Sequence, residues 1–202
     1  MTRARAPLRA AAATLLLAAL AGCASVAPAP ETAALAPPGA SFDAAGRLSA
    51  RRGADGVAAH FAWSHAEDRD RIDVATPTGQ VIARMQRDAA GIRVERPDAP
   101  ATAFADWGAL TRDVLGVAIP VDGLAAWIQG APAPGADYGV ERDAAGRPLV
   151  LRQQGWEIVY AYADADAGAP ARPSRLVMRY PDSEPVEVRV VVDRWSLADA
   201  RP

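Results

Sequence analysis

The chain has 202 residues, half of them hydrophobic, and its 22 basic and 24 acidic residues give a formal net charge of −2. Apart from the two histidines, every basic residue is an arginine, and the arginines are interspersed with acidic residues as on a solvated surface. This composition excludes nucleic acid as a partner, because a nucleic-acid-binding protein needs a basic surface and a high isoelectric point. The single cysteine excludes an internal disulfide.

The N-terminal segment has the pattern of a secretory signal peptide. Arg3, Arg5 and Arg9 precede an uninterrupted apolar run over residues 10–20, and no acidic residue comes before that run. The run is shorter than the roughly 20 apolar residues that a membrane-spanning helix needs. We therefore predict that residues 1–22 are a signal peptide that is removed from the mature protein.

The only cysteine, Cys23, ends the stretch LAGC, which resembles the lipobox of bacterial lipoproteins. In a lipobox the cysteine becomes the acylated first residue of the mature protein; the alternative is an ordinary signal peptide with an incidental cysteine. A catalytic thiol is disfavoured because the stretch that follows is rich in alanine and proline, so we interpret residues 23–41 as a lipidated flexible tether. Ala24 instead of Asp is typical, by the same resemblance, of outer-membrane lipoproteins. We expect a protein anchored by lipid to the outer membrane and facing the periplasm.

After the tether, apolar and polar residues alternate between turn residues, which predicts an antiparallel sheet with one buried face. In the last such segment, Val186, Val188, Val190 and Val192 fall on one face. The segments with this alternation include 56–64, 70–76, 80–85, 91–96, 156–163, 174–180 and 186–195. We predict about ten or eleven strands.

The tetrapeptide Asp-Ala-Ala-Gly occurs three times, but its flanking sequences do not align, so we reject a repeat architecture. Asp88 to Gly91 and Asp143 to Gly146 suit type I turns between hairpin strands. The copy at Asp43 opens the first strand.

Helical spacing is found only in the middle of the chain. Thr102 as N-cap, an apolar stripe and Gly116 as a stop predict a helix over 102–115. Asp122 is the expected cap of a shorter helix over 123–129, which ends before Gly130. The order of strands, two helices and strands predicts an α+β, mainly β fold in which the helices lie across one face of a curved sheet.

No strong catalytic motif is present, and we predict that the protein is not an enzyme and needs no metal or cofactor. His60 and His65 are interpreted as exposed strand and turn residues, because metal ligands would need a third partner. The acidic segment 164–168 resembles part of a calcium loop but lacks the third carboxylate and the later glutamate.

Large apolar side chains are abundant at the positions of the predicted strands and helices that face the interior. They either fill a plain core or line a concave apolar cavity, and the sequence does not separate the two. The candidate interior set consists of Phe61, Trp63, Ile72, Val74, Val81, Met85, Trp107, Leu110, Trp127, Trp156, Ile158, Tyr160, Met178, Val188 and Val190.

Five blocks of sequence, taken in order, resemble the LolB family of outer-membrane lipoprotein receptors. They are FDAAGRLSARRG, VATPTGQVIARM, LGVAIPVDGLAAWIQGAP, QQGWEIVYAYAD and VEVRVVVDRW. The resemblance implies an open antiparallel half-barrel over residues 42–196, with helices covering its concave face and a tail over 197–202. It also implies a monomer that accepts acylated lipoproteins from the periplasmic carrier LolA in a hydrophobic cavity and inserts them into the outer membrane.

The resemblance is incomplete at one loop. Family members present an apolar residue, typically leucine, between a proline and a glycine, and this loop is implicated in releasing cargo into the membrane. Here the loop reads Pro77, Thr78 and Gly79, and Thr78 is a poor membrane wedge. Either release depends on Val81, Ile82 or another neighbouring group, or the loop has a weaker role in this protein. The segment before the first strand is also too short for the full N-terminal helix of some members.

Two alternatives stay open at this point. A LolA-like lipid or lipoprotein carrier would share the fold, although the lipobox argues against a soluble protein. A structural outer-membrane lipoprotein would bind a protein partner through its sheet edge and would have a filled core instead of a lipid cavity.

Overall fold

The computed structural model describes residues 40–163 and 172–197. The predicted signal peptide, Cys23, the acidic segment 164–168 and the end of the chain lie outside these ranges. The strands are β1 (Phe42–Arg52), β2 (Asp55–Ala66), β3 (Arg69–Ala75), β4 (Val81–Asp88), β5 (Gly91–Arg96), β6 (Ala99–Phe104), β7 (Tyr138–Arg142), β8 (Pro148–Gln153), β9 (Trp156–Tyr162), β10 (Pro173–Tyr180) and β11 (Val186–Leu197). The helices are α2 (Trp107–Leu115) and α3 (Val121–Trp127). The mainly β fold with eleven antiparallel strands confirms the prediction.

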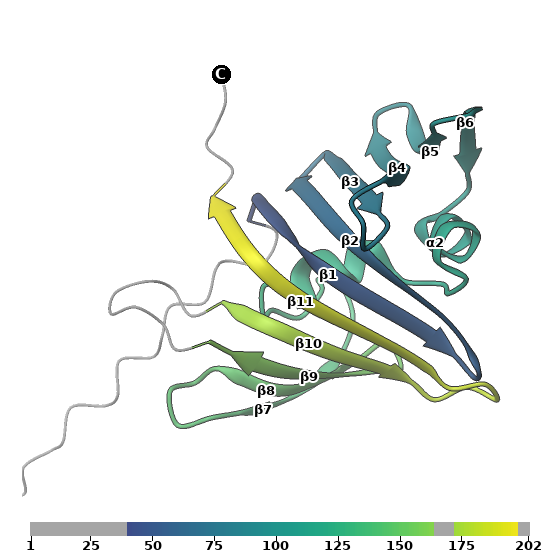
Figure 1. Cartoon of the computed structure of the whole chain (residues 1–202). Coiled ribbons are helices and arrows are strands. Elements are labelled where there is room, and N and C mark those ends of the chain that lie inside the picture. The colour runs from purple at the N-terminus through teal and green to yellow at the C-terminus, as the bar shows by residue number, and fades with distance from the viewer. Residues whose placement is uncertain (1–39, 164–171, 198–202) are drawn as a thin grey trace, which may run out of the picture. The chain divides into compact units, whose positions relative to one another are not determined.

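The strand order explains why the helices cross the sheet. The order is β6-β5-β4-β3-β2-β1-β11-β10-β9-β8-β7, so the chain builds outward from β1 to one edge and later returns from the other edge until β11 pairs with β1. The segment between β6 and β7 has to pass from edge to edge. Figure 1 shows it on the inner side of the curved, open sheet.

Alternation along the strands buries the inner face, as the sequence predicts. In β11, for example, Val186, Val188, Val190 and Val192 are all buried, and the buried residues of the sheet and helices form one apolar cluster. Each fully buried side chain of this size contributes about 1.5–3 kcal/mol to folding. The core therefore lies between the inner face of the sheet and the helical segment.

Gly46 marks a β-bulge between β1 and β11. The register of the two strands shifts between Ala45 and Gly46, and a Cβ atom at position 46 would lie 2.0 Å from the carbonyl oxygen of Val191. Only glycine permits that approach. The extra residue of the bulge is Asp193 on β11, which accepts two hydrogen bonds of 3.1 and 2.9 Å from the guanidinium of Arg47 on the outer face.

The first helix begins later than the sequence analysis predicts. Residues 99–104 form the edge strand β6, and the N-cap of α2 is Asp106, whose carboxylate accepts a hydrogen bond of 2.8 Å from the Ala109 amide. Thr102 is not a cap because its backbone pairs with Val94 of β5. The predicted stop is correct, since Gly116 closes α2 in the left-handed region with φ 75°.

The second helix starts at Val121, and its N-cap is Pro120 rather than Asp122. Asp122 lies in the first turn, where its charge favours the positive end of the helix dipole. No helix of the described part of the chain is both long and apolar enough to cross a membrane.

The two predicted Asp-Ala-Ala-Gly turns are confirmed. The Asp88 carboxylate accepts a hydrogen bond of 2.9 Å from the Ala90 amide between β4 and β5, and Asp143 accepts one of 2.9 Å from Ala145 between β7 and β8. The copy at Asp43 lies within β1.

Candidate functional site

The candidate interior set is buried with one exception. Every member except Val81 is no more than 6% exposed, and all of these side chains belong to one apolar cluster. They come from six strands and both helices, so the fold brings together residues that are far apart in the chain. Whether they touch acyl chains stays a prediction.

The prediction that Val81 is an interior residue is wrong, because its side chain is 42% exposed. It has the same phase as Ala83 and Met85, which are buried, but it is the first residue of β4. A register shift on β3 also falls beside it, where Val74 pairs with Ala83 and the next residue pairs with Val81. A residue at a strand end has too few neighbours to be covered.

A small apolar cavity lies between the sheet and the helices. Its volume is about 40 Å³, and it is lined by Leu48, Phe61, Trp63, Ile72, Met85, Thr111, Leu115, Ile119, Val121, Leu124, Ile128 and Val190. This is little more than the space of one water molecule, roughly 30 Å³, and far less than the roughly 300–1,000 Å³ of ligand pockets. The helical side chains fill most of the inner face, and an acyl chain would fit only if they moved away.

Sequence reasoning found part of this lining and missed the rest. Leu48 was not in the candidate interior set because β1 alternates weakly around its bulge. Ile119 and Val121 were missed because they flank a proline in the connection between the helices. Their spacing of two around Pro120 is a signal that one side of this extended connection is buried.

Larger hollows exist on the surface, and charged side chains of both signs line them beside apolar ones. One of about 670 Å³ is lined by Asp43, Arg71, Asp73 and Asp193, and one of about 740 Å³ by Arg69, Asp70, Arg87 and Asp88, among other residues. Charged walls of both signs do not suit an acyl chain, so the inner face is the better candidate for an apolar ligand.

The second helix is joined to the sheet by the buried amide of Gln153 on β8. Its oxygen accepts hydrogen bonds of 2.8 Å from the Trp127 indole and of 2.8 Å from the Ala133 amide. Its nitrogen donates bonds of 2.9 Å to the Ala133 carbonyl and of 3.0 Å to the Ala136 carbonyl. Gln153 is 3% exposed, so all four bonds lie in the interior or at its edge.

The same stretch explains the residues QQGW that open one of the five sequence blocks quoted above. Gly155 has φ 80°, and a Cβ atom there would lie 2.8 Å from the Tyr180 ring. Trp156 is buried and its ring centroid lies 5.3 Å from that of Tyr180. Each of these residue types is therefore required by a contact in the structure.

The first helix, α2, has weaker polar connections. Arg96 at the end of β5 forms an ion pair with Asp113 on the exposed side of α2. The buried Thr111 hydroxyl accepts a hydrogen bond of 2.7 Å from the Ile119 amide and donates one of 2.9 Å to the Trp107 carbonyl. Thr111 thus joins α2 to the connection that follows it, and the contact of α2 with the sheet is mainly apolar.

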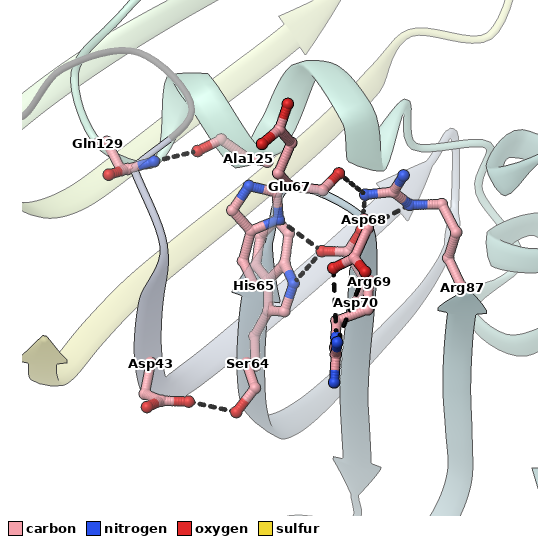
Figure 2. Close-up of polar contacts among 11 residues, drawn as sticks. Asp43, Ser64, His65, Glu67, Asp68, Arg69, Asp70, Arg87, Ala125 and Gln129 are labelled. Carbon is pink, nitrogen blue, oxygen red and sulfur yellow. Dashed lines mark hydrogen bonds and ion pairs between the residues drawn. The ribbon is translucent and has the colours of Figure 1, made fainter. Parts of the chain in front are cut away.

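A buried polar cluster holds three neighbouring strands together (Figure 2). The carboxylate of Asp70 on β3 accepts hydrogen bonds of 2.9 Å from the Trp63 indole and of 2.8 Å from Arg87 Nε on β4. The His65 Nδ1 atom lies 2.7 Å from the same carboxylate. Burial by itself would raise the pKa of Asp70, but hydrogen bonds from His65, Trp63 and Arg87 outweigh it and keep that pKa below its ordinary value.

His65 is one residue that the sequence analysis placed wrongly. It is 9% exposed and belongs to the buried face, whereas His60 is exposed as predicted. The signal was present, because His65 has the same phase as Phe61 and Trp63. The described residues contain no group of three candidate metal ligands around either histidine.

The loop of Pro77, Thr78 and Gly79 is a closed turn. The Thr76 amide donates a hydrogen bond of 2.8 Å to the Gln80 carbonyl, and Gly79 has φ 93°. The Thr78 hydroxyl lies 2.8 Å from the Thr76 hydroxyl, so the two side chains satisfy each other. The loop presents no apolar side chain larger than proline, and the nearest exposed one is Val81.

Comparisons with known proteins are consistent with this arrangement. A family model described as "Outer membrane lipoprotein LolB" matches residues 40–195. The outer-membrane lipoprotein LolB of Thiobacillus denitrificans is 37% identical over 180 residues, which cover 89% of this chain and 93% of that protein. The protein of the same name from Chromobacterium violaceum is 38% identical over 181 residues, which cover 87% and 92% of the two chains.

A solved structure of a LolA superfamily protein from Nitrosomonas europaea is also similar. It superposes with a TM-score of 0.51 and 11% sequence identity, and the match covers 86% of this chain and 93% of that chain. At this level of identity the similarity concerns the fold alone.

Proposed function

This chain belongs to the LolB family of outer-membrane lipoproteins, and from that membership we propose that it is a lipoprotein receptor. In this proposal it accepts acylated lipoproteins from the soluble periplasmic carrier LolA. Their acyl chains enter the apolar inner face of the sheet, and the cargo is then inserted into the outer membrane. The role is one of binding and transfer, without a chemical reaction.

The observation that carries the proposal is the continuous apolar inner face under two short helices. Each methylene of an acyl chain that leaves water is stabilised by about 0.8 kcal/mol, so a lipoprotein needs shielding while it crosses an aqueous compartment. Passing the chains from one apolar interior to another leaves that free energy nearly unchanged. Modest differences in affinity then decide the direction of transfer.

The interior must open before it can accept cargo, because its cavity holds only about 40 Å³. The contacts of the helical segment favour movement of α2. Its exposed pair of Arg96 and Asp113 is worth little in water, whereas α3 is held through the buried amide of Gln153. In the proposed cycle, α2 and its connection to α3 move away from the sheet and the acyl chains replace them.

We further propose that acylated Cys23 and the tether of residues 23–41 keep the receptor at its target membrane. A tethered acceptor raises the effective concentration of the inner face near the membrane surface. The protein would then be delivered by the same pathway that it serves.

For release, we propose that the exposed side chain of Val81 contributes the apolar contact that Thr78 does not supply. The two lie at the same end of β4, and Val81 is 42% exposed. Thr78→Leu should therefore improve delivery of cargo into liposomes more than it alters acceptance of cargo from the carrier. Equal changes in both steps would contradict the assignment of this loop to release.

The decisive experiment uses the full chain with Cys23→Ala, which prevents acylation. This protein is incubated with a radiolabelled lipoprotein bound to LolA, and the label on each protein is measured after separation. Transfer of label to the chain is the expected result. If no label moves while a LolB from one of the named relatives accepts it, the receptor proposal fails.

The filled interior favours one rival, a structural outer-membrane lipoprotein that binds a protein partner and no lipid. The two proposals differ in the same assay. A structural lipoprotein with a permanently filled core would accept no label under any condition, whereas a LolA-like carrier would accept label but fail to deliver it into liposomes.

A further inference from the structure

Besides Arg52 Nε, three buried polar atoms have no hydrogen-bond partner within the described residues: Trp107 Nε1, Gln129 Oε1 and the Tyr160 hydroxyl. Their residues are 2%, 0% and 5% exposed. The indoles of Trp63 and Trp127, by contrast, donate bonds of 2.9 and 2.8 Å. Unpaired polar atoms at such depth destabilise a folded chain, so each one calls for an explanation.

The two unpaired atoms of the helical segment belong to residues that are close in the chain to residues lining the apolar cavity. The Trp107 carbonyl accepts the hydrogen bond of 2.9 Å from Thr111, so Trp107 lies one turn before this cavity residue on the same face of α2. Gln129 directly follows Ile128, another cavity residue. Its nitrogen donates a bond of 2.9 Å to the Ala125 carbonyl, which leaves the oxygen as its free atom (Figure 2).

The third atom belongs to the sheet and lies level with the cavity wall. Leu48 and Val190, which line the cavity, are register partners. Val190 is paired with Leu176, and Leu176 with Tyr160, so all four residues form one row across the inner face. Since neighbouring strands are about 4.8 Å apart, Tyr160 stands roughly 10 Å from the wall residue Val190. Burial raises the pKa of Tyr160, and its hydroxyl therefore stays a donor.

The chemistry of the three atoms specifies the ligand. An indole N–H and a phenol O–H donate, whereas the amide oxygen of Gln129 accepts. The ester linkages of a membrane lipid offer carbonyl acceptors but no N–H group. An acylated polypeptide offers both, because the peptide groups next to its acyl chains carry N–H donors and carbonyl acceptors over several residues.

We propose that Trp107 Nε1, Gln129 Oε1 and the Tyr160 hydroxyl are hydrogen-bonding positions for the polar linkages of a lipidated polypeptide. The two donors bind carbonyl oxygens and the Gln129 oxygen binds a backbone N–H. This inference rests on the proposed function and deepens it. The apolar surface binds the acyl chains of lipoproteins and of membrane lipids alike. The three polar atoms give a lipoprotein anchor the higher affinity of the two.

The test compares two probes on the full chain with Cys23→Ala. One is a fluorescent lipopeptide acylated on its N-terminal cysteine, and the other is a dialkyl ether phosphatidylcholine with chains of the same length and no carbonyl or N–H group. Tyr160→Phe and Gln129→Leu should each weaken binding of the lipopeptide about tenfold, the factor that one neutral hydrogen bond supplies. Affinity for the ether lipid should stay within twofold.

The free energy of unfolding distinguishes a ligand-binding role of the Tyr160 hydroxyl from a role in stabilising the fold. Tyr160→Phe removes a buried unpaired hydroxyl, so its free energy of unfolding should be unchanged or higher. The matched control is Tyr162→Phe, whose hydroxyl donates a bond of 2.9 Å to the Pro148 carbonyl. This control should lose stability and keep the preference between the two probes.

Four results would overturn the inference. Equal weakening for both probes would assign the atoms to the fold, and unchanged lipopeptide binding in both variants would show that water already satisfies them. A wild-type chain that binds neither probe would refute the proposed function and this inference with it. A wild-type chain that binds both probes equally would refute the inference alone.

Discussion

The buried carboxylate of Asp70 and the buried amide of Gln153 each join several segments of the chain, but they join different layers. Asp70 connects β2, β3 and β4 to one another within the sheet. Gln153 connects β8 to α3 and to the segment that follows it. The polar contacts of α2 run to its own connection and to one exposed arginine.

Because of this difference, we expect α2 to move away from the sheet more easily than α3. A buried polar group resists separation because each partner left unpaired costs about 1–3 kcal/mol. Opening at α3 would expose or break several such bonds, whereas opening at α2 breaks mainly apolar packing that acyl chains can replace. The half of the sheet below α2 keeps its shape during opening because Asp70 holds its strands together.

The largest effect should come from Gln153→Leu. It leaves the Trp127 indole, the Ala133 amide and two carbonyls without their partner, and we expect it to lower the free energy of unfolding by about 4 kcal/mol. Urea unfolding measures the change. Gln154→Asn, at the exposed neighbouring position, is the control and should change stability little. A loss below about 1 kcal/mol for Gln153→Leu would remove the basis for a fixed α3.

The second largest effect should come from Asp70→Asn, with a loss of about 2–3 kcal/mol at neutral pH, because the amide cannot accept from Trp63, His65 and Arg87 as a carboxylate does. The pKa of Asp70 is lower in the folded chain than its unfolded value of about 3.9. Its stabilising contribution is therefore complete above that unfolded value and is lost as the pH falls through the lower folded pKa.

Unfolding of both proteins at a series of pH values checks this dependence. The difference between wild type and Asp70→Asn should shrink as the pH falls below about 4. Asp193→Asn, on the exposed face, is the control, since its partner Arg47 is 60% exposed. A difference that grows below about pH 4 would contradict the lowered pKa of Asp70.

The contrast between the hydrogen bonds of Asp70 and those of Gln153 also shows which features the sequence predicts well. Alternation placed Trp63 and the valines of β11 correctly, because burial of one face dictates a period of two. The same alternation predicts that the side chain of His65 is buried. A histidine is nevertheless assigned to the exposed face of a strand when no hydrogen-bond partner for it is known. That partner, Asp70, is opposite His65 in the β2–β3 register, and pairing across a hairpin follows from the turn more than from either strand.

Other features could not be predicted because they depend on contacts between distant segments. The bonds of Gln153 join residues 17 to 26 positions apart, and nothing in the local pattern marks it as a hydrogen-bonding centre. Thr102 has the residue type of a helix cap, but pairing with β5 outweighs that local preference. The volume of the cavity depends on how side chains from both layers interdigitate, which periodicity does not describe.

A smaller effect is expected for Thr111→Val, which keeps the shape of the side chain but leaves the buried Ile119 amide without its acceptor. We expect a loss of about 1–2 kcal/mol in urea unfolding. If Thr111 joins α2 only to the connection between α2 and α3, amide hydrogen exchange should become faster in α2 and in that connection. Exchange in β8 should stay unchanged. Faster exchange in β8 would show that Thr111 supports the attachment of α3 as well.

The smallest change in stability, but the most specific for α2, is expected for Asp113→Asn. Its partner Arg96 is 34% exposed, and such surface pairs contribute about 0–1 kcal/mol, so global unfolding should be nearly unaffected. Local opening is different, because this pair is the polar contact between α2 and β5 and its loss should raise the exchange rate of α2 amides severalfold.

Asp182→Asn is the matched control for this last variant, since Asp182 pairs with Arg52 at 3.3 Å and has similar exposure, but lies between β10 and β11, away from the helices in the chain. It should leave exchange in α2 unchanged. Equal acceleration in α2 and α3 after Asp113→Asn would mean that the two helices open as one unit. The buried bonds of Gln153 would then have to break in every opening, and the cost of admitting an acyl chain would rise by the free energy of those bonds.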